Sequence, residues 1–234
     1  MQTSRFLQIT STKDFYKKLK LTLLVNEIFQ SIQGESLYNG LPCVFVRLSG
    51  CNLRCSYCDT RYAYYNGTEM QLSEIVRYVD AYKCDLVEIT GGEPLFQKKT
   101  PALIYMLLEK GYQVLLETNG SFDICVVDNR CIRIVDIKCP SSKESKKNHM
   151  DNLKKINHPD QIKFVISNRN DYDFAKKILK KTTIDFPAGN ILFSPAHKIM
   201  PPYILSEWIL KDNLNVRLHL QIHKIIWPDK NKGV

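Results

Sequence analysis

Short apolar segments alternate with amphipathic segments along most of this 234-residue chain, and this alternation limits the folds it can adopt. The apolar segments are rich in β-branched and aromatic residues, which is typical of strands covered on both faces. The segments between them place apolar residues at helical spacing. Strands that alternate with helices form a parallel sheet joined by crossover helices. The predicted strands are residues 43–48, 86–90, 113–117, 132–137, 161–166, 190–193 and 216–222, and the predicted helices are 72–82, 101–110, 151–156, 171–180 and 204–211.

The length of the repeating part favours an open barrel over a closed one. About six strand–helix units fit into the roughly 190 residues after Pro42, whereas a complete (β/α)₈ barrel typically takes about 250 residues. We therefore predict an α/β fold, a partial, open parallel β/α barrel of about six units. Residues 25–234 are predicted to form this domain, with residues 1–24 as an N-terminal extension. Thr100 is predicted to cap the helix that Pro101 opens.

The hydropathy and charge of the chain indicate a cytoplasmic protein. No apolar run approaches the about 18 residues that a membrane span needs, and the start of the chain lacks the features of a secretory signal. The net charge of +9 includes basic runs at residues 17–20, 143–147 and 176–181. No aromatic residues interleave these runs as base stacking would need, so solvated faces are favoured over a nucleic-acid site. We expect no direct contact with a membrane or with nucleic acid.

Three of the eight cysteines form a tight cluster directly after the predicted strand 43–48. Cys51, Cys55 and Cys58 have the spacing C-x3-C-x2-C, which in a reducing compartment indicates a metal centre and not a disulfide framework. Structural zinc takes four ligands, usually from two C-x2-C pairs, and the sequence offers no evident fourth ligand. Three thiolates suit a [4Fe–4S] cluster in which one iron has no protein ligand. The other five cysteines are predicted to be buried hydrophobes or surface thiols.

The cysteine loop resembles that of the radical S-adenosylmethionine (SAM) superfamily, with Tyr57 as the aromatic residue before the third cysteine. A second motif agrees, because Gly91-Gly92-Glu93-Pro94 follows the predicted strand 86–90 and paired glycines let a ligand approach the backbone closely. The resemblance implies that SAM binds the open iron, and that one electron cleaves it to methionine and a 5′-deoxyadenosyl radical. The SAM contacts that it implies are Tyr57, Cys58, Asp59, Gly92, Glu117, Asp136, Ile137, Lys138 and Ser194.

Five ordered motifs resemble the 7-carboxy-7-deazaguanine synthase family over about residues 25–234. They are Gln33-Gly34-Glu35, Phe45-Val46-Arg47, Gly50-Cys51-Asn52-Leu53, Cys58-Asp59-Thr60 and Gln221-Ile222-His223-Lys224. The resemblance implies a radical SAM carbon–nitrogen lyase of queuosine biosynthesis. Such an enzyme contracts the ring of 6-carboxy-5,6,7,8-tetrahydropterin and releases ammonia to give 7-carboxy-7-deazaguanine. The substrate contacts that it implies are Ile32, Gln33, Gly34, Arg47, Thr90, His223 and Pro228.

The same resemblance implies a magnesium ion and two protein partners. It places Mg²⁺ at the Thr60 hydroxyl, bridging to the substrate carboxylate, and Mg²⁺ is commonly held by few protein ligands plus substrate. A threonine after Cys-Asp is otherwise typical of a turn or a helix N-cap, and that alternative stays open. A flavodoxin- or ferredoxin-type electron donor and a homodimer are also implied.

Two other functions are compatible with the cysteine loop. A radical SAM activase would place a glycyl radical on a partner protein, but the Gln33-Gly34-Glu35 turn, Arg47 and His223 indicate a small-molecule pocket. A zinc-containing RNA-binding protein would use the thiols structurally and the positive charge on phosphates. The iron and zinc contents of the purified protein distinguish the zinc-containing alternative from both radical SAM functions.

Overall fold

One sheet runs through the residues that the computed structural model describes, which are 21–181, 186–230 and 232–234. Its strand order is β3-β1-β2-β4-β5-β6-β7-β8-β9. Every pair from β2 to β9 is parallel, whereas β1 is antiparallel to both of its neighbours. The strands are β1 (Thr22–Ile32), β2 (Pro42–Leu48), β3 (Thr68–Gln71), β4 (Leu86–Gly91), β5 (Gln113–Thr118), β6 (Ile132–Asp136), β7 (Gln161–Ile166), β8 (Ile191–Pro195) and β9 (Arg217–Leu218).

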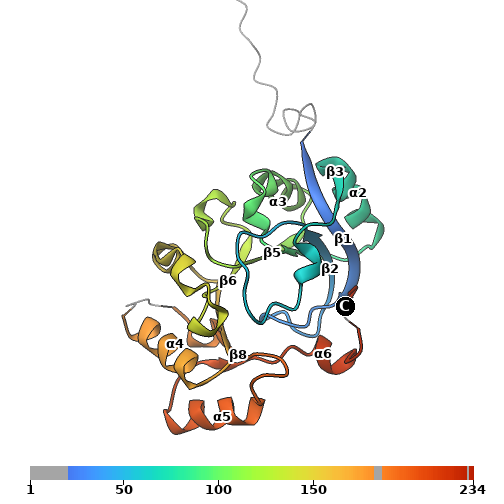
Figure 1. The fold of residues 1–234 in the computed structure, drawn as a ribbon. Helices are drawn as coiled ribbons and strands as arrows, with labels where there is room; N and C mark the ends of the chain where they lie inside the picture. The colour runs from blue at the N-terminus through green and yellow to red at the C-terminus, as the bar shows by residue number, and fades with distance from the viewer. Residues whose placement is uncertain (1–20, 182–185, 231) are drawn as a thin grey trace, which may run out of the picture.

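The sheet is curved and open, with helices along its outside (Figure 1). Its two edges are β3 and β9, so the barrel does not close. The predicted open, mostly parallel β/α barrel is therefore confirmed. The helices are α2 (Leu72–Ala81), α3 (Thr100–Glu109), α4 (Arg169–Lys181), α5 (Pro202–Lys211) and the short α6 (His223–Ile226).

The largest differences from the predicted elements lie at the two ends of the sheet. Strands β1 and β3 were not predicted, and β1 begins at Thr22, inside the span expected to be an N-terminal extension. The remainder of that extension, residues 1–20, lies outside the described residues. The predicted strand 216–222 is reduced to the two residues of β9, and the predicted helix 151–156 is the 3₁₀ helix Met150–Lys154.

The predicted cap of α3 is also wrong. Thr100 is the first residue of the helix itself, and Lys99 occupies the cap position. The Thr100 hydroxyl instead donates a hydrogen bond to the carbonyl oxygen of Pro94 at 2.6 Å. The side chain therefore ties the helix to the turn that follows β4, next to the Gly-Gly-Glu-Pro motif.

Inward-facing side chains change from apolar to polar along β2, β4, β5 and β6. A small cluster of Cys43, Phe45, Leu86, Leu115, Ile132 and Ile134 fills the inside of the barrel at the amino ends of the strands. Because side chains alternate between faces, the next inward positions on these strands are polar. The register places Arg47 beside Thr90, and Asp136 beside Lys163. The carboxyl ends of the strands thus enclose a polar space above an apolar floor.

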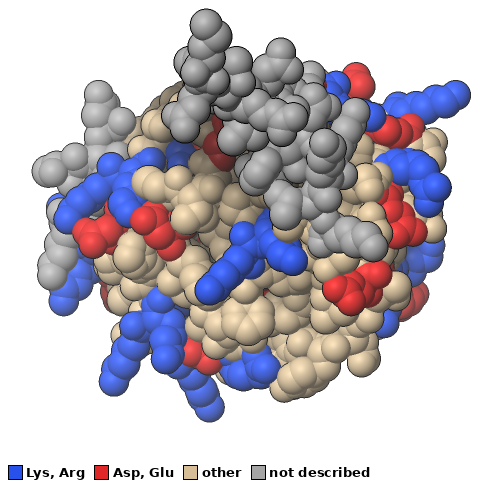
Figure 2. Space-filling model, turned by 90° about the horizontal axis from the view of Figure 1, so that it is seen from above, with Lys and Arg blue, Asp and Glu red and all other residues tan. Residues whose placement is uncertain are grey.

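The surface carries both signs of charge. On the face shown in Figure 2, Lys and Arg side chains project at several separate places and acidic side chains lie among them. Within the described residues, no helix has the length and apolar character needed to cross a membrane.

A buried ion pair connects β6 to the residue that precedes β7. The Arg133 Nε atom lies 3.1 Å from both carboxylate oxygens of Asp160, and the Arg133 backbone N–H donates to Asp160 at 2.8 Å. The two side chains are only 4% and 1% exposed. Removing one member of such a pair leaves the other charge buried without compensation.

We expect Asp160→Asn to lower the free energy of unfolding by about 3–5 kcal/mol, since Arg133 would keep its buried charge. Asp128→Asn is the matched control, because Asp128 pairs with the half-exposed Arg130 at the surface. That change should cost at most about 1 kcal/mol. Chemical denaturation measures both. Equal losses in the two variants would show that the buried pair contributes no more than an exposed one.

Candidate active site

A cavity of about 280 Å³ opens at the carboxyl ends of β2 and β4 to β8, the edge where parallel β/α folds place their sites. Both of the two predicted sets, for SAM and for substrate, contribute to its wall. The predicted residues that line it are Ile32, Gln33, Gly34, Arg47, Cys51, Cys55, Tyr57, Cys58, Asp59, Thr60, Thr90, Gly92, Glu117, Asp136, Lys138, Ser194 and His223.

Two predicted residues do not line the cavity. The Ile137 side chain is fully buried in the apolar layer between the sheet and the helices. Pro228 is exposed, and of the segment that follows it Val234 reaches the wall of the cavity. Each is close in sequence to residues that line the cavity, but neither Ile137 nor Pro228 contributes to its wall.

The three clustered cysteines lie together on one wall. Cys51 accepts a hydrogen bond from the Leu53 backbone N–H at 3.4 Å and faces the Asn119 amide at 3.8 Å. Burial raises the pKa of Cys51, and it raises that of Cys55 to about 11. Thiols in such a site ionise when they bind a metal, which compensates for their burial. The set therefore fits iron ligation.

The geometry of these thiols also bears on the kind of metal centre. Among the described residues, no three His, Cys, Asp or Glu side chains converge as ligands of one ion would. A [4Fe–4S] cluster is larger and is held by thiolates around its periphery. Three cysteines that share one loop and one cavity wall are compatible with that larger group.

The two glycines after β4 pack the backbone against the cysteine loop. Gly91 has a φ of +147°, and a Cβ at this position would lie 2.1 Å from the Leu48 carbonyl oxygen. A Cβ on Gly92 would lie 2.3 Å from the Gly50 carbonyl oxygen and 2.8 Å from the Cβ of Cys51. Only glycine permits this approach, in which the Gly92 N–H donates to the Leu48 carbonyl at 3.1 Å and the residue lines the cavity without a side chain.

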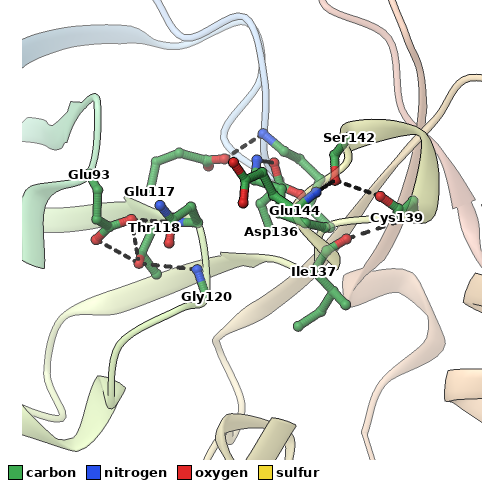
Figure 3. Close-up of polar contacts among 12 residues, drawn as sticks. Glu93, Glu117, Thr118, Gly120, Asp136, Ile137, Cys139, Ser142 and Glu144 are labelled. Atoms are coloured by element: carbon green, nitrogen blue, oxygen red, sulfur yellow. Dashed lines mark hydrogen bonds and ion pairs between the residues drawn. The ribbon is translucent and has the colours of Figure 1, made fainter. Parts of the chain in front are cut away.

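Glu93 stabilises the same turn through hydrogen bonds to its carboxylate. Its buried carboxylate accepts hydrogen bonds from the Leu95 backbone N–H at 2.9 Å, the Thr118 hydroxyl at 2.9 Å and the Asn119 backbone N–H at 2.6 Å. Figure 3 shows Glu93 and Thr118 side by side, with Gly120 bonded to the same hydroxyl. Burial raises the pKa of Glu93 to about 7, although these donors act in the opposite direction. Glu93 thus joins the turn after β4 to the end of β5.

The β6 end contributes a charged pair and an unused acceptor. The Lys138 ammonium lies 2.6 Å from Oδ2 of Asp136. Burial would lower the pKa of Lys138, but the Asp136 carboxylate raises it above its usual value. Asp136 Oδ1 and the Tyr57 hydroxyl are buried without a hydrogen-bond partner among the described residues. Both atoms belong to residues of the cavity wall, so they fit a polar ligand such as SAM.

A buried lysine joins three segments at the centre of the cavity. The Lys163 ammonium contacts Glu117 and lies 2.8 Å from Glu35, whose other oxygen accepts from the Gln221 amide at 2.7 Å. Burial raises the pKa of Glu117 to about 8, because one ammonium cannot compensate for two carboxylates. Burial opposes ionisation of Glu35 as well, but Lys163, His223 and His219 lower its pKa below the usual range.

Glu35, Lys163 and Gln221 were absent from the predicted site. A sequence signal existed for Lys163, because a lysine in the middle of the apolar segment 161–166 is unusual in a strand covered on both faces. No comparable signal marked the other two as its partners.

Gln33 organises the wall through its side chain. Both of its backbone polar groups are already used, since its N–H donates to Leu41 and its carbonyl accepts from Gly40, each at 2.8 Å. The side-chain amide donates to the buried Glu88 and accepts from the Glu35 backbone N–H at 2.8 Å. Gln33 therefore positions the Glu88 carboxylate and the backbone of Glu35, while its own backbone N–H and carbonyl are both already bonded within the chain.

Arg47 is held in place at the end of β2. Its Nε donates to Glu27 at 2.7 Å, and its guanidinium lies 5.6 Å from the Phe29 ring and 5.8 Å from the Tyr62 ring. These contacts fix the plane of the guanidinium beside the cavity. A fixed fork is suited to a carboxylate ligand.

Thr60 and Ser194 already have hydrogen-bond partners within the chain. The Thr60 hydroxyl donates to Asp59 at 2.9 Å, and Lys224 lies 3.3 Å from the same carboxylate. Thr60 occupies the cap position of a 3₁₀ helix, but its side chain makes no capping hydrogen bond. The Ser194 hydroxyl is buried and bonded to His219 at 2.9 Å, so it meets the cavity already paired.

His223 packs tightly against the turn after β1. A Cβ on Gly34 would lie 2.1 Å from Nδ1 of His223, so only glycine fits between this imidazole and the turn. Burial lowers the pKa of His223, which favours the neutral imidazole.

The chain is similar to known proteins over most of its length. Residues 45–139 match the radical SAM superfamily. A 7-carboxy-7-deazaguanine synthase of Koribacter versatilis is 42% identical, with 90% of this chain and 99% of the relative covered. A 7-carboxy-7-deazaguanine synthase of Chlorobaculum tepidum is 43% identical, with 91% and 97% covered. QueE from Escherichia coli has a similar fold, with a TM-score of 0.75 at 22% identity over 91% of this chain and 99% of that chain.

The buried Glu88 predicts a specific pH dependence of stability. Burial raises its pKa to about 7 in the folded state, from 4.5 for the free side chain. The folded state therefore holds the Glu88 proton more tightly than the unfolded state does. This stabilises the folded protein at acidic pH, and the free energy of unfolding falls as the pH rises through about 7. Glu88→Gln removes this titration, so the variant should gain about 2–3 kcal/mol relative to wild type between about pH 5 and about pH 8.

Chemical denaturation over that pH range measures the difference, with the exposed Glu207→Gln as control. Parallel curves for Glu88→Gln and wild type would contradict a raised pKa at Glu88.

Proposed function

We propose, from the premise that this chain belongs to the 7-carboxy-7-deazaguanine synthase family, that it converts 6-carboxy-5,6,7,8-tetrahydropterin to 7-carboxy-7-deazaguanine with loss of ammonia. This is a step of queuosine biosynthesis. The observation that carries the proposal is that one cavity collects three clustered thiols and a ring of strand-end polar side chains. Radical SAM membership implies a [4Fe–4S] cluster and SAM as cofactors.

Cys51, Cys55 and Cys58 would hold the cluster, and the polar groups beside them would orient SAM. When bound, the reduced cluster supplies one electron to SAM, which yields the radical that takes hydrogen from the substrate. Gly92, which has no side chain and whose N–H already donates to Leu48, lies in the same wall as the unused Asp136 oxygen. These groups would bind the polar parts of SAM. Glu93 keeps the turn that carries Gly92 in place through its bonds to the end of β5.

The opposite wall would bind the pterin. Arg47 offers its guanidinium to the substrate carboxylate, with its orientation fixed by Glu27. Gln33 holds the buried Glu88 carboxylate and the backbone of the partly buried Glu35, and carboxylates of this kind suit the N–H groups of a pterin edge. Thr90 and His223 complete this wall. A desolvated, preorganised set of charges holds a small polar substrate in one orientation.

Magnesium binding at Thr60 is part of the proposal. Thr60 lies in the cavity wall and makes no helix-capping hydrogen bond, so a turn residue bonded to Asp59 is the structural alternative that the test below addresses. A single hydroxyl with substrate oxygens and waters is a suitable ligand set for this ion.

We also propose a cytoplasmic location and a homodimer. All eight cysteines are free thiols, as in a reducing compartment.

The cavity volume of about 280 Å³ favours a small molecule over the peptide segment that an activase would bind. The homodimer rests on family membership alone.

Incubation of reconstituted protein with SAM, dithionite, Mg²⁺ and the carboxytetrahydropterin tests the proposed reaction. We expect mass spectrometry to detect 7-carboxy-7-deazaguanine. Cys55→Ala should abolish product and lower iron content, because one of three cluster thiolates is lost. Cys125→Ala changes an exposed cysteine outside the loop and should leave both unchanged. Full iron content and full activity in Cys55→Ala would contradict the cluster assignment.

Thr60→Ala should weaken the stimulation of turnover by Mg²⁺ without loss of iron or of SAM binding. Water can take the vacated coordination position at lower affinity, so a higher Mg²⁺ concentration should restore part of the rate. Thr60→Ser retains the hydroxyl and should respond to Mg²⁺ as wild type does. Activity against Mg²⁺ concentration, together with the thermal midpoint, measures the effect. Identical magnesium curves for wild type and Thr60→Ala would make Thr60 a turn residue only.

A further inference from the structure

The Asn119 side chain contacts the first cysteine of the loop, and the proposed function gives it no role. Its amide nitrogen lies 3.8 Å from Sγ of Cys51, which is within the range of an N–H···S hydrogen bond. The Leu53 backbone N–H donates to the same sulfur at 3.4 Å. Cys51 thus accepts from two N–H donors, one in its own loop and one directly after β5.

The orientation of the Asn119 amide follows from its other hydrogen bonds. Its Oδ1 accepts from the Ser121 backbone N–H at 3.0 Å and from the Ser121 hydroxyl at 2.6 Å. A backbone N–H can only donate, so the amide oxygen must face Ser121 and the –NH₂ group must face the cysteine loop. One hydrogen of that group donates to Oδ1 of Asn52 at 3.1 Å, which leaves the other hydrogen for Cys51.

These contacts use the full hydrogen-bonding capacity of the side chain. An asparagine amide has two N–H hydrogens and an oxygen that accepts two hydrogen bonds. The hydrogens go to Asn52 and Cys51, and both acceptor positions are taken by Ser121. Although Asn119 lines the cavity, its side chain is therefore committed to the cysteine loop and not to a ligand.

The donor and the acceptor are both held in place. The Asn52 amide donates to the Ser121 hydroxyl at 2.9 Å, so the side chains of Asn52, Asn119 and Ser121 form a closed ring. The Asn119 backbone N–H donates to the buried Glu93 carboxylate at 2.6 Å. Cys51 is confined from the other side, since a Cβ on Gly92 would lie 2.8 Å from its own Cβ.

We propose that the Asn119 amide donates a hydrogen bond to the Cys51 thiolate of the [4Fe–4S] cluster and thereby raises the reduction potential of that cluster. The proposal rests on the proposed function, because it needs Cys51 as a cluster ligand. The cluster gains one electron from the reductant and becomes more negative. Since a hydrogen bond to an anion strengthens with its charge, the donor stabilises the reduced form more than the oxidised form. Hydrogen bonds to the sulfurs are among the factors that set such potentials.

The midpoint potential of the cluster in Asn119→Val tests the proposal. Valine has no donor, and it fills enough of the space to keep water from replacing the amide. We expect about a tenfold lower ratio of reduced to oxidised cluster at the midpoint potential of wild type, which for one electron is a shift of about 59 mV to lower potential. A redox titration with dithionite, in which EPR quantifies the reduced cluster, measures this ratio.

Asn190→Val is the matched control. Asn190 is 7% exposed, as Asn119 is, but its amide donates to the Asp160 carbonyl at 2.9 Å, away from the cysteines. This variant should keep the wild-type potential even if it lowers the thermal midpoint. An unchanged potential in Asn119→Val with full iron content would overturn the proposal. Weaker SAM binding in Asn119→Val at an unchanged potential would overturn it in favour of a direct contact with SAM.

A second measurement uses the wild-type holoenzyme, so it does not depend on the folding of a variant. The chain is produced with asparagine that carries ¹⁵N in its side-chain amide, and pulsed EPR of the reduced cluster detects nitrogens that are hydrogen-bonded to its sulfur ligands. We expect a ¹⁵N coupling from Asn119, whereas Asn52 gives none because its amide donates to Ser121. Absence of any coupling in wild type would refute the hydrogen bond.

The two proposals fail in different ways. Wild type that binds iron but forms no deazapurine would refute the proposed reaction, and the ¹⁵N coupling and the potentials would still decide the role of Asn119. Formation of the deazapurine together with equal potentials in wild type and Asn119→Val would support the reaction and refute the role of Asn119.

Discussion

The parallel register of strands β2 and β4 to β8 is the constraint on which the whole site depends. Because side chains alternate between faces, one inward position fills the apolar floor and the next reaches the cavity. Phe45 and Arg47 show this on β2, and Leu115 and Glu117 show it on β5. A shift of one residue would turn both polar side chains toward the apolar layer beneath the helices, where burying their charge is costly.

That register brings opposite charges together inside the barrel. Lys163 serves two carboxylates and Lys138 serves Asp136, so the buried charge is distributed over linked pairs. The balance is incomplete, since burial raises the pKa of Glu117 to about 8. A cavity with unused acceptors and fixed cations suits polar, charged ligands such as SAM, which carries both signs of charge, and a carboxylated pterin, which is an anion with N–H donors.

The parallel core of the fold was predictable because its signal is local. Each central strand is an apolar segment of five to seven residues, followed by a segment with helical spacing. The antiparallel strands β1 and β3 escaped prediction, since β1 mixes polar and apolar residues and is only partly buried. The predicted strand 216–222 was also too long, because the sheet pairing ends at Leu218. There the Ile222 backbone N–H bonds to the Gly34 carbonyl oxygen, and this distant contact turns the chain into α6.

The sequence by itself determined the alternating fold, the cysteine loop and the glycine turn, because each is encoded by neighbouring residues. Its resemblance to the family also implied Arg47 and Glu117 as site residues. Only the tertiary structure decided that Lys163 pairs with Glu35, which is 128 residues away, and that the Glu144 carboxylate accepts from the Arg54 backbone N–H in the cysteine loop. The physical reason is that such pairs depend on the curvature and register of the whole sheet, and no local pattern of residues specifies either one.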